Sequence, residues 1–375
     1  MSQKNYIILQ FDILIFPPAL SLIEILLDKD EEVELLGYCS KIENLQKYLA
    51  KGLRFYNLIN YNDGDSSIVK LKKLQTFKNK VEKIVKNNSN NQFWFLSIES
   101  VWLFNKIIPD VKSIIYFFEV PKFSVPIQYR IWCSNKFFFR AVAAAFRVIS
   151  CEVNRGLITK SFFGLTDEQN VIIPNKTNFF LDESKDQEIE GILNTFQNKK
   201  IILYQGGFNF PERRLDELCE AVEYLPENFV VAIMGPETPY KSLLIQKYQS
   251  SRVLFLPFIK APDHLKITES AYIGFLSYFP TRGNIEQILN VLYCAPNKIY
   301  EYAKFGIPML SNALPALQTF YEANYCGIAV ADYNGKALAD AILKIEANYE
   351  VMTQNALIAF NSVDVGEIME NKILI

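Results

Sequence analysis

Short apolar runs alternate with segments of helical pattern along the whole chain, and this alternation restricts the possible folds more than any other feature. In the first half of the chain the predicted strands are Tyr6–Phe11, Glu32–Leu36, Phe93–Ile98, Ser113–Phe118, Ala145–Ser150 and Val171–Ile173. Helical segments separate them, among them Ala19–Leu27 and the Lys-rich Ser67–Lys86. Apolar runs spaced in this way are typical of buried parallel strands joined by right-handed crossovers. The first half therefore predicts an α/β domain with a doubly wound parallel sheet.

The alternation stops and then restarts, which predicts two domains. Residues Asn175–Asn198 are polar and lack a strong period, so we interpret them as an interdomain linker with a short helix. The second series of predicted strands is Lys200–Tyr204, Phe229–Met234, Arg252–Leu256, Tyr272–Leu276, Ile307–Leu310 and Ile328–Ala331. A chain of 375 residues is long enough for two such domains, each with its own core.

Composition excludes several classes of protein. Half of the residues are hydrophobic and 21% are charged, which is typical of a soluble globular chain rather than a disordered one. No uncharged apolar run is long enough to predict a membrane-spanning helix. The apolar start, Tyr6–Leu27, contains Asp12 and Glu24, so we reject a signal peptide. The six cysteines form no close pair, which excludes a zinc knuckle and favours a reducing cytoplasm.

Charge is distributed unevenly between the two halves. Residues 1–180 contain 23 Lys and Arg against 17 Asp and Glu, and the rest of the chain contains 16 against 24. A basic first half suits an anionic membrane surface or a phosphate-bearing acceptor, and lysines on solvated helix faces explain it equally well. The aromatic and basic segment Trp132–Arg140 could likewise rest on a bilayer or form a half-buried core helix. The net charge of −2 argues against a nucleic-acid partner.

The first candidate binding motif is the segment YQGGFNFPERRL, which begins at Tyr204. Gly206 and Gly207 follow a predicted strand and precede a predicted helix over Glu212–Tyr224. Without side chains, they let backbone N–H groups approach a diphosphate with the helix dipole behind them. The glycine pattern is not G-x-G-x-x-G, which disfavours an NAD-type site. Arg213 can hold a phosphate through two hydrogen bonds, or it is merely an exposed charge in the first turn of the helix.

The second motif is the segment APNKIYEYAKFGIP, which begins at Ala295. It predicts a loop, a short helix, a turn at Gly306 and a strand over Ile307–Leu310. Lys298 and Glu301 fall within one turn of that helix. A lone carboxylate after a Pro-Asn loop is well placed to accept hydrogen bonds from two hydroxyls of a ribose.

The two motifs, in this order, resemble those of nucleotide-sugar glycosyltransferases of the GT-B class, close to family 4 (glycosyl transferases group 1). In that family the second Glu of an E-x7-E motif binds the ribose of the donor, and Glu301 matches it. The first Glu falls on Tyr293, so the resemblance implies altered sugar recognition, with Tyr293, Asn297 or nearby backbone taking part. Gly306 begins a match to the family's G-x-P turn.

The resemblance also implies contacts to the diphosphate of the donor. Arg213 stands where the family commonly has a phosphate-binding lysine. The family's other basic residue falls on Phe208, and Lys298 is a candidate substitute. The nucleotide is expected near the strand-end loop at Gly235 and Pro236, for which a plain turn is the alternative. Ligands bind at such rims in parallel sheets.

Glu119 is the predicted acidic residue on the acceptor side. It ends the apolar run Ile114–Phe118, and Phe118 occupies the place where related sequences often have a histidine. The only histidine, His264, lies in the second domain, and we interpret it as a structural residue or a minor contact to the base. The first domain therefore lacks a histidine base. In a retaining transfer the departing phosphate can take the acceptor proton, and Glu119 then orients the acceptor, acts as the base or only caps the strand.

The resemblance implies two Rossmann-like domains facing a cleft, the GT-B fold. Residues 1–180 would hold the acceptor and residues 199–348 the donor, with helices over about 349–375 packing back on the first domain. The implied reaction moves a sugar from a nucleoside diphosphate to a hydroxyl acceptor with retention, in polysaccharide or glycolipid synthesis. The implied partners are a nucleotide sugar and a glycan or lipid-linked acceptor, without cofactor or metal, in the cytoplasm or at the inner membrane surface.

Two other functions remain open from the sequence. A nucleotide-sugar 2-epimerase shares the fold, but its chemistry usually depends on histidines and acids that this chain lacks. A non-catalytic subunit that binds a nucleotide sugar would keep Glu301. The substitutions at Phe118 and Tyr293 are compatible with that second alternative.

Overall fold

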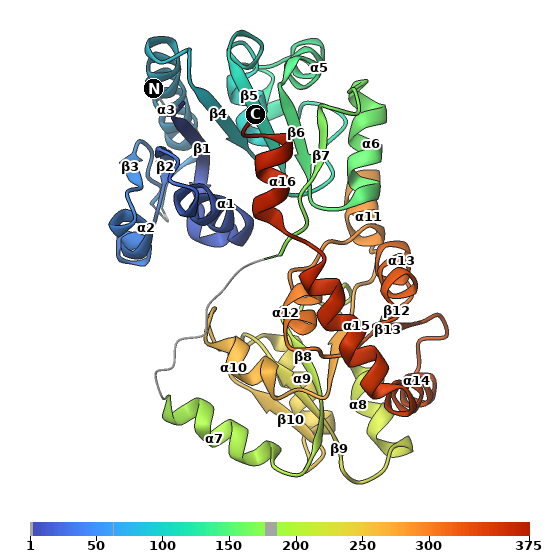
Figure 1. Ribbon diagram of the computed structural model, residues 1–375. Coiled ribbons are helices and arrows are strands. Elements are labelled where there is room, and N and C mark those ends of the chain that lie inside the picture. Colours follow the sequence, from blue (N-terminus) through green and yellow to red (C-terminus); the bar gives the residue numbers. More distant parts are fainter. Residues whose placement is uncertain (1–2, 63, 177–185) are drawn as a thin grey trace. The chain divides into compact units, whose positions relative to one another are not determined.

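The computed structural model describes residues 3–62, 64–176 and 186–375, and the chain divides into two compact units (Figure 1). Unit 1 comprises Met1–Pro174 and Val365–Ile375, and unit 2 comprises Asn175–Asp364. Residues 177–185 of the predicted linker lie outside the described residues, and the rest of that segment includes the helix α7 (Gln187–Phe196).

Unit 1 is built on a parallel sheet with the strand order β3-β2-β1-β4-β5-β6-β7. Its strands are β1 (Asn5–Asp12), β2 (Val33–Tyr38), β3 (Arg54–Asn57), β4 (Gln92–Leu96), β5 (Lys112–Phe117), β6 (Arg147–Ser150) and β7 (Asn170–Ile172). Its α-helices are α1 (Pro17–Asp28), α2 (Gln46–Ala50), α3 (Ser67–Asn87), α4 (Ile98–Phe104), α5 (Asn135–Ala144), α6 (Val153–Phe163) and α16 (Val365–Lys372). The order of strands reverses between β1 and β4, so the carboxyl ends of these two strands form the topological switch point of the sheet.

Unit 2 is built on a second parallel sheet with the strand order β10-β9-β8-β11-β12-β13. Its strands are β8 (Lys200–Gln205), β9 (Phe229–Met234), β10 (Val253–Leu256), β11 (Ile273–Leu276), β12 (Met309–Asn312) and β13 (Gly327–Val330). Besides α7, its α-helices are α8 (Asp216–Ala221), α9 (Pro239–Tyr248), α10 (His264–Glu269), α11 (Ile285–Leu292), α12 (Lys298–Lys304), α13 (Pro315–Asn324), α14 (Gly335–Ala347) and α15 (Tyr349–Asn361). Here the order reverses between β8 and β11. The doubly wound parallel architecture predicted from the sequence is confirmed in both units.

The sequence did not predict β3, because this strand lies at the edge of its sheet. Arg54, Tyr56 and Asn57 are exposed there, so the strand lacks the apolar run that marks the buried strands. Other strands are shifted by one or two residues. For example, β4 ends at Leu96 because α4 already begins at Ile98, and β12 begins at Met309 rather than Ile307.

The expectation that all helices after residue 349 pack on the first domain was wrong for α15. This helix contacts α12 in unit 2, where Ala356 is fully buried. Gly306, at φ +66°, leaves room for it, since a Cβ there would lie 3.0 Å from Thr353 Cγ2. Only α16 joins unit 1, where Arg147 Nε donates a hydrogen bond of 2.6 Å to the Lys372 carbonyl.

Candidate functional site

The predicted donor residues gather at the switch point of the unit 2 sheet. β8 and β11 are neighbours there, and β8 is followed directly by Gly206 at φ +150°. The helix α12, which carries Glu301, lies over the same strands. Its Tyr302 is fully buried, and the Tyr302 hydroxyl donates a hydrogen bond of 2.9 Å to the Leu203 carbonyl of β8. A Cβ on Gly274 of β11 would lie 2.4 Å from the Tyr302 ring, so only glycine admits this ring against the strand.

Glu301 belongs to a buried polar network. Its Oε2 accepts a hydrogen bond of 2.7 Å from Gln205 Nε2, and His264 Nε2 lies 3.5 Å from the same oxygen. Gln205 is positioned in turn by Thr268, whose hydroxyl donates a hydrogen bond of 2.7 Å to Gln205 Oε1. Among the described residues, Oε2 is the only oxygen of this carboxylate that carries a hydrogen bond, so its other oxygen is available to a ligand.

The surroundings of Glu301 favour its ionised form. Burial alone would raise the pKa of this carboxyl, but the hydrogen bond and charge of His264, with smaller contributions from Lys298 and Gln205, lower the pKa below its ordinary value. Glu301 is therefore an ionised carboxylate at neutral pH, held in one orientation by its neighbours. Such a group can accept hydrogen bonds from hydroxyl groups without first losing a proton.

Lys298 lies directly over the glycine turn. A Cβ on Gly206 would be 3.0 Å from Lys298 Cε and 3.2 Å from Lys298 Nζ, so the glycine leaves space for the ammonium. Gly235, which follows β9, also packs against this turn, and a Cβ there would lie 2.1 Å from the Gly206 carbonyl oxygen. A cation and a second glycine-containing loop thus both lie close to the turn at Gly206.

Arg213 lies beside the Tyr204 hydroxyl, which is hydrogen-bonded to the same turn. The Tyr204 hydroxyl donates a hydrogen bond of 2.5 Å to the Gly207 carbonyl. Burial raises the pKa of Tyr204 to about 12, against the opposing charges of Lys298 and Arg213. The Arg213 guanidinium also lies 4.1 Å from the centre of the Tyr278 ring, just beyond β11. The structure thus places two cations around the glycine turn.

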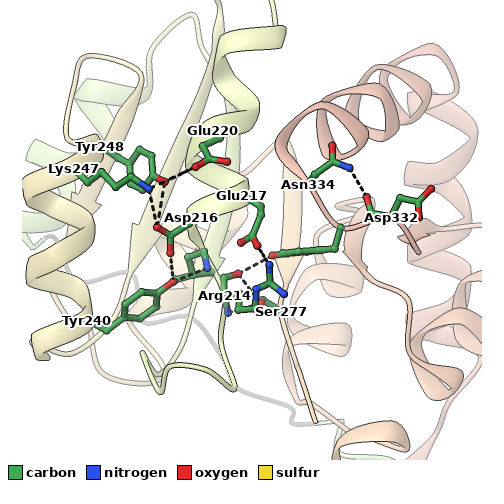
Figure 2. Close-up of polar contacts among 12 residues, drawn as sticks. Arg214, Asp216, Glu217, Glu220, Tyr240, Lys247, Tyr248, Ser277, Asp332 and Asn334 are labelled. Atoms are coloured by element: carbon green, nitrogen blue, oxygen red, sulfur yellow. Dashed lines mark hydrogen bonds and ion pairs between the residues drawn. The ribbon is translucent and has the colours of Figure 1, made fainter. Parts of the chain in front are cut away.

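The helix expected behind the glycine turn begins later than predicted, which is a correction to the phosphate-loop interpretation. α8 starts at Asp216 and carries acidic residues in its first turn. Arg213 is half-buried in the preceding loop and is not the exposed first-turn charge considered from the sequence. Other groups satisfy the start of α8, since the Leu215 N–H donates to the Tyr240 hydroxyl and the Arg214 N–H to Ser277 Oγ. Figure 2 shows Tyr240, Arg214 and Ser277 around this end of the helix. The dipole of α8 therefore does not support an anion at Gly206.

The neighbouring Arg214 is held by protein groups. It forms an ion pair with Glu217 of α8, visible in Figure 2, and lies over the Phe279 and Tyr333 rings. Its carbonyl accepts a hydrogen bond of 2.7 Å from the Tyr333 hydroxyl. Arg214 thus anchors the loop, while Arg213 is turned toward Tyr204 and Tyr278.

The loop at Gly235 and Pro236 is stabilised from within the protein. Lys241 of α9 is almost fully buried, and its Nζ donates hydrogen bonds to the Gly235 carbonyl at 2.9 Å and the Leu256 carbonyl at 2.8 Å. This lysine ties the ends of β9 and β10 together. The half-buried Tyr293 follows the end of α11, and Asn297 precedes α12, where its carbonyl accepts a hydrogen bond of 3.0 Å from the Glu301 N–H.

Glu119 lies in unit 1, next to a cavity of about 250 Å³. The cavity is lined by Phe118 and Glu119 after β5, by Phe11 at the end of β1 and by Ser97 after β4, among others. Buried Arg155 of α6 supports the loop after β5, because its Nη1 donates a hydrogen bond of 2.9 Å to the Phe118 carbonyl.

Gln205 and Thr268 were not predicted as parts of the site. Both are buried polar residues, and the only available signal was a glutamine between an apolar strand and a glycine pair. His264 lies beside the carboxylate of Glu301, a position that its place in the sequence did not indicate.

Comparison with known proteins shows what this part of the chain resembles. Residues 199–348 match the family model described as glycosyl transferases group 1. The resemblance inferred from the two motifs is thereby confirmed for the part of the chain that carries them.

Solved structures extend the likeness beyond these residues to the rest of the chain. HepE from Anabaena in complex with UDP is similar with a TM-score of 0.68 and 14% identity over 98% of each chain. Sucrose-phosphate synthase from Thermosynechococcus elongatus gives the same TM-score, identity and coverage. A putative UDP-N-acetylglucosamine 2-epimerase from Listeria monocytogenes follows with 0.64 and 11% over 95% of this chain and 91% of that one. At these identities the likeness shows the fold, and the predicted GT-B class is confirmed.

Three further observations are negative. None of the curated proteins matches the sequence. Within residues 3–62, 64–176 and 186–375, no helix is long and apolar enough to cross a membrane. The same described residues contain no group of three or more His, Cys, Asp or Glu side chains that could hold a metal ion.

Proposed function

We propose that the protein transfers a sugar from a nucleoside diphosphate to a hydroxyl acceptor and that unit 2 binds the donor. The observation that carries this proposal is the ionised Glu301, fixed by Gln205 and His264 near a glycine turn that is covered by the Lys298 ammonium. A carboxylate with an available oxygen suits the two hydroxyls of a ribose. Cations at a glycine turn suit a diphosphate.

The proposed donor contacts follow from this geometry. Glu301 accepts hydrogen bonds from the ribose, and Lys298 and Arg213 neutralise the diphosphate. Backbone at Gly206, Gly207, Gly235 and Pro236 lies along the nucleotide, while Tyr293 and Asn297 contact the sugar. HepE, with the same fold, was solved with UDP and with UDP-glucose, which supports a nucleotide sugar as the donor.

In the proposed reaction, the bond between the anomeric carbon and the β-phosphate oxygen breaks, and a bond from that carbon to the acceptor oxygen forms. Both electrons of the broken bond leave with the diphosphate, whose growing negative charge Arg213 and Lys298 stabilise. The acceptor proton passes to the departing phosphate oxygen on the same face of the sugar, so the product retains its configuration. Glu119 orients the acceptor hydroxyl, and neither a cofactor nor a metal is required.

A thermal-shift screen against UDP-, GDP-, TDP- and ADP-sugars tests the donor assignment. A ligand at 100 times its dissociation constant should add about 2.7 kcal/mol to the free energy of unfolding. We expect one nucleotide to raise the unfolding temperature of the wild type and of Glu322→Ala, whose carboxylate is exposed on α13. The same nucleotide should have little effect on Glu301→Ala, and equal shifts in all three proteins would contradict the proposal.

The epimerase and the non-catalytic subunit predict different products. The structural likeness to a putative UDP-N-acetylglucosamine 2-epimerase favours including the first of these in the test. Incubation of the nucleotide sugar alone would yield an epimer from an epimerase, whereas a transferase releases nucleoside diphosphate in amounts equal to the glycosylated acceptor. Donor binding without either product would establish a non-catalytic subunit.

We also propose that unit 1 contacts an anionic membrane surface, where a lipid-linked acceptor would lie. Ile127 and Ile131 are 78% and 65% exposed, and the outer face of α5 exposes Lys136, Phe137 and Arg140. Exposed apolar side chains among cations are typical of surfaces that bind anionic bilayers. Co-sedimentation with vesicles containing phosphatidylglycerol, but not with pure phosphatidylcholine, is expected for the wild type and should be lost in Phe137→Asp.

A further inference from the structure

The cavity beside Glu119 lies at the switch point of the unit 1 sheet. β1 and β4 are neighbours (Figure 1), and the cavity is lined by Phe11 at the end of β1 and by Ser97 directly after β4. In open parallel sheets ligands bind outside the carboxyl ends of the strands at this position. The topology therefore marks the cavity as a binding site independently of its side chains.

Ser97, which lines this cavity, is held in a strained backbone conformation. Its φ of +71° and ψ of 160° lie in a region that residues other than glycine rarely adopt. The Ser97 N–H is fixed by a hydrogen bond of 3.0 Å to the Tyr116 carbonyl of β5. Its Oγ is buried and makes no hydrogen bond of ordinary geometry in the described part of the chain. A strained residue that brings a buried hydroxyl to a cavity, beside the Glu99 carboxyl, points to a ligand with polar groups.

The charged side chains at the cavity disfavour an anionic ligand. Glu99, in the first turn of α4, and Glu119 line it together with a single cation, Lys122. Burial raises the pKa of Glu99 and the charge of Glu119 acts in the same direction, while the adjacent Ser97 hydroxyl and Lys122 oppose them. Two carboxylates against one ammonium disfavour an anionic ligand by like-charge repulsion.

The remaining walls are apolar, formed by Phe11, Phe16, Phe117 and Phe118 together with Ile98, Val120 and Pro121. Phe16 and Phe118 stack with ring centres 5.1 Å apart and planes inclined by 27°. The cavity of about 250 Å³ is smaller than the roughly 300–1,000 Å³ of pockets that enclose drug-sized ligands, so it suits a single ring. A sugar ring presents C–H bonds on its face, which pack on phenyl groups, and hydroxyls at its edge.

We propose that this cavity binds one uncharged sugar ring of the acceptor, with Ser97 and Glu99 as the residues that select it over a sugar phosphate. The inference rests on the proposed function, because it names the acceptor of that reaction. Glu99 accepts hydrogen bonds from ring hydroxyls, Ser97 Oγ gains a well-aligned partner, and Phe118 covers one face of the ring. The ring then lies beside Glu119, which orients the reacting hydroxyl.

Saturation-transfer NMR with methyl α-glucopyranoside, methyl N-acetylglucosaminide and glucose 6-phosphate tests this inference on the full chain. At least one neutral glycoside should bind the wild type, and glucose 6-phosphate should bind at least about tenfold more weakly. Glu99→Gln keeps the shape of the side chain and should weaken the neutral probe by about tenfold or more. Ser97→Ala should also weaken it, whereas Glu43→Gln, at an exposed site of unit 1, should not.

Glu301→Ala distinguishes failure of this inference from failure of the proposed donor site. It should reduce nucleotide binding and leave the neutral sugar signal unchanged. If nucleotide binding survives in Glu301→Ala, the donor assignment fails while the cavity assignment stands. The cavity assignment is overturned if no neutral probe binds the wild type, if glucose 6-phosphate binds as strongly, or if Glu99→Gln and Ser97→Ala bind the neutral probe like the wild type.

Discussion

The two units place their candidate sites at the same topological position but form them differently. In unit 2 the carboxylate of Glu301 is already oriented by Gln205 and His264. In unit 1 the strained Ser97 keeps its hydroxyl without a well-formed partner, next to phenyl rings and the carboxylate of Glu99. The first arrangement is preorganised and suits the charged and polar parts of the nucleotide that we propose as its ligand. The second leaves hydrogen-bonding groups for the ligand to satisfy and relies on shape for the rest.

The largest effect is expected from Lys241→Ala, which tests whether the unit 2 site depends on the hydrogen bonds of this buried lysine to the ends of β9 and β10. The substitution leaves the carbonyls of Gly235 and Leu256 without their charged donor inside the protein. It should lower the free energy of unfolding by about 3 kcal/mol or more, measured by chemical denaturation. Lys336→Ala, at an exposed position of α14, serves as the control. A loss as small as in that control would show that the strand ends are held by other contacts.

Glu301→Ala should weaken binding of the donor nucleotide without unfolding the protein. Loss of hydrogen bonds to a charged group costs about 1.5–3 kcal/mol, which corresponds to roughly 10- to 150-fold in affinity. Calorimetry on the folded variant measures it, with Glu322→Ala as the matched control. Nucleotide affinity equal to that of the wild type would remove Glu301 from the donor site.

Arg213→Ala separates the phosphate from the nucleoside. Affinity for the nucleoside diphosphate should fall by about tenfold, the lower part of the range for hydrogen bonds to charged groups, while affinity for the bare nucleoside should hardly change. Arg214→Ala is the comparison, because Arg214 contacts Glu217 and aromatic rings and should affect stability instead. Equal losses for both ligands in Arg213→Ala would mean that this residue acts through packing.

Glu119→Gln should give the smallest effect and tests the acceptor side. The amide keeps the shape and part of the hydrogen bonding, so transfer should remain within about tenfold of the wild type if the departing phosphate takes the proton. Removal of an essential base costs about 10²–10⁴-fold. Single-turnover transfer with donor saturated distinguishes these results, and a collapse of the rate at unchanged donor affinity would make Glu119 the base. A product of inverted configuration would independently contradict retention.

The sequence predicted unit 2 in more detail than unit 1, for physical reasons. The motif that contains Glu301 combines local signals, a loop, a short helix and a glycine turn, so the helix and the buried strands could be read directly. The network around Glu301 could not be predicted, because Gln205 meets this carboxylate only through the packing of α12 on β8, and Thr268 of α10 in turn contacts Gln205. In unit 1, nothing local indicates that Ser97 has a positive φ.

The return of α16 to unit 1 has a consequence for the order of folding. Unit 1 is encoded in two pieces, and all of unit 2 is synthesised between them. At roughly 5–20 residues per second, about 10–40 s pass before the ribosome reaches Val365. During that time the first unit lacks the buried side chains of Met369 and Ile373 and the contact at Arg147. The surface that α16 will cover is then open to chaperones or to other chains, so the nascent protein is most vulnerable while its second domain is being made.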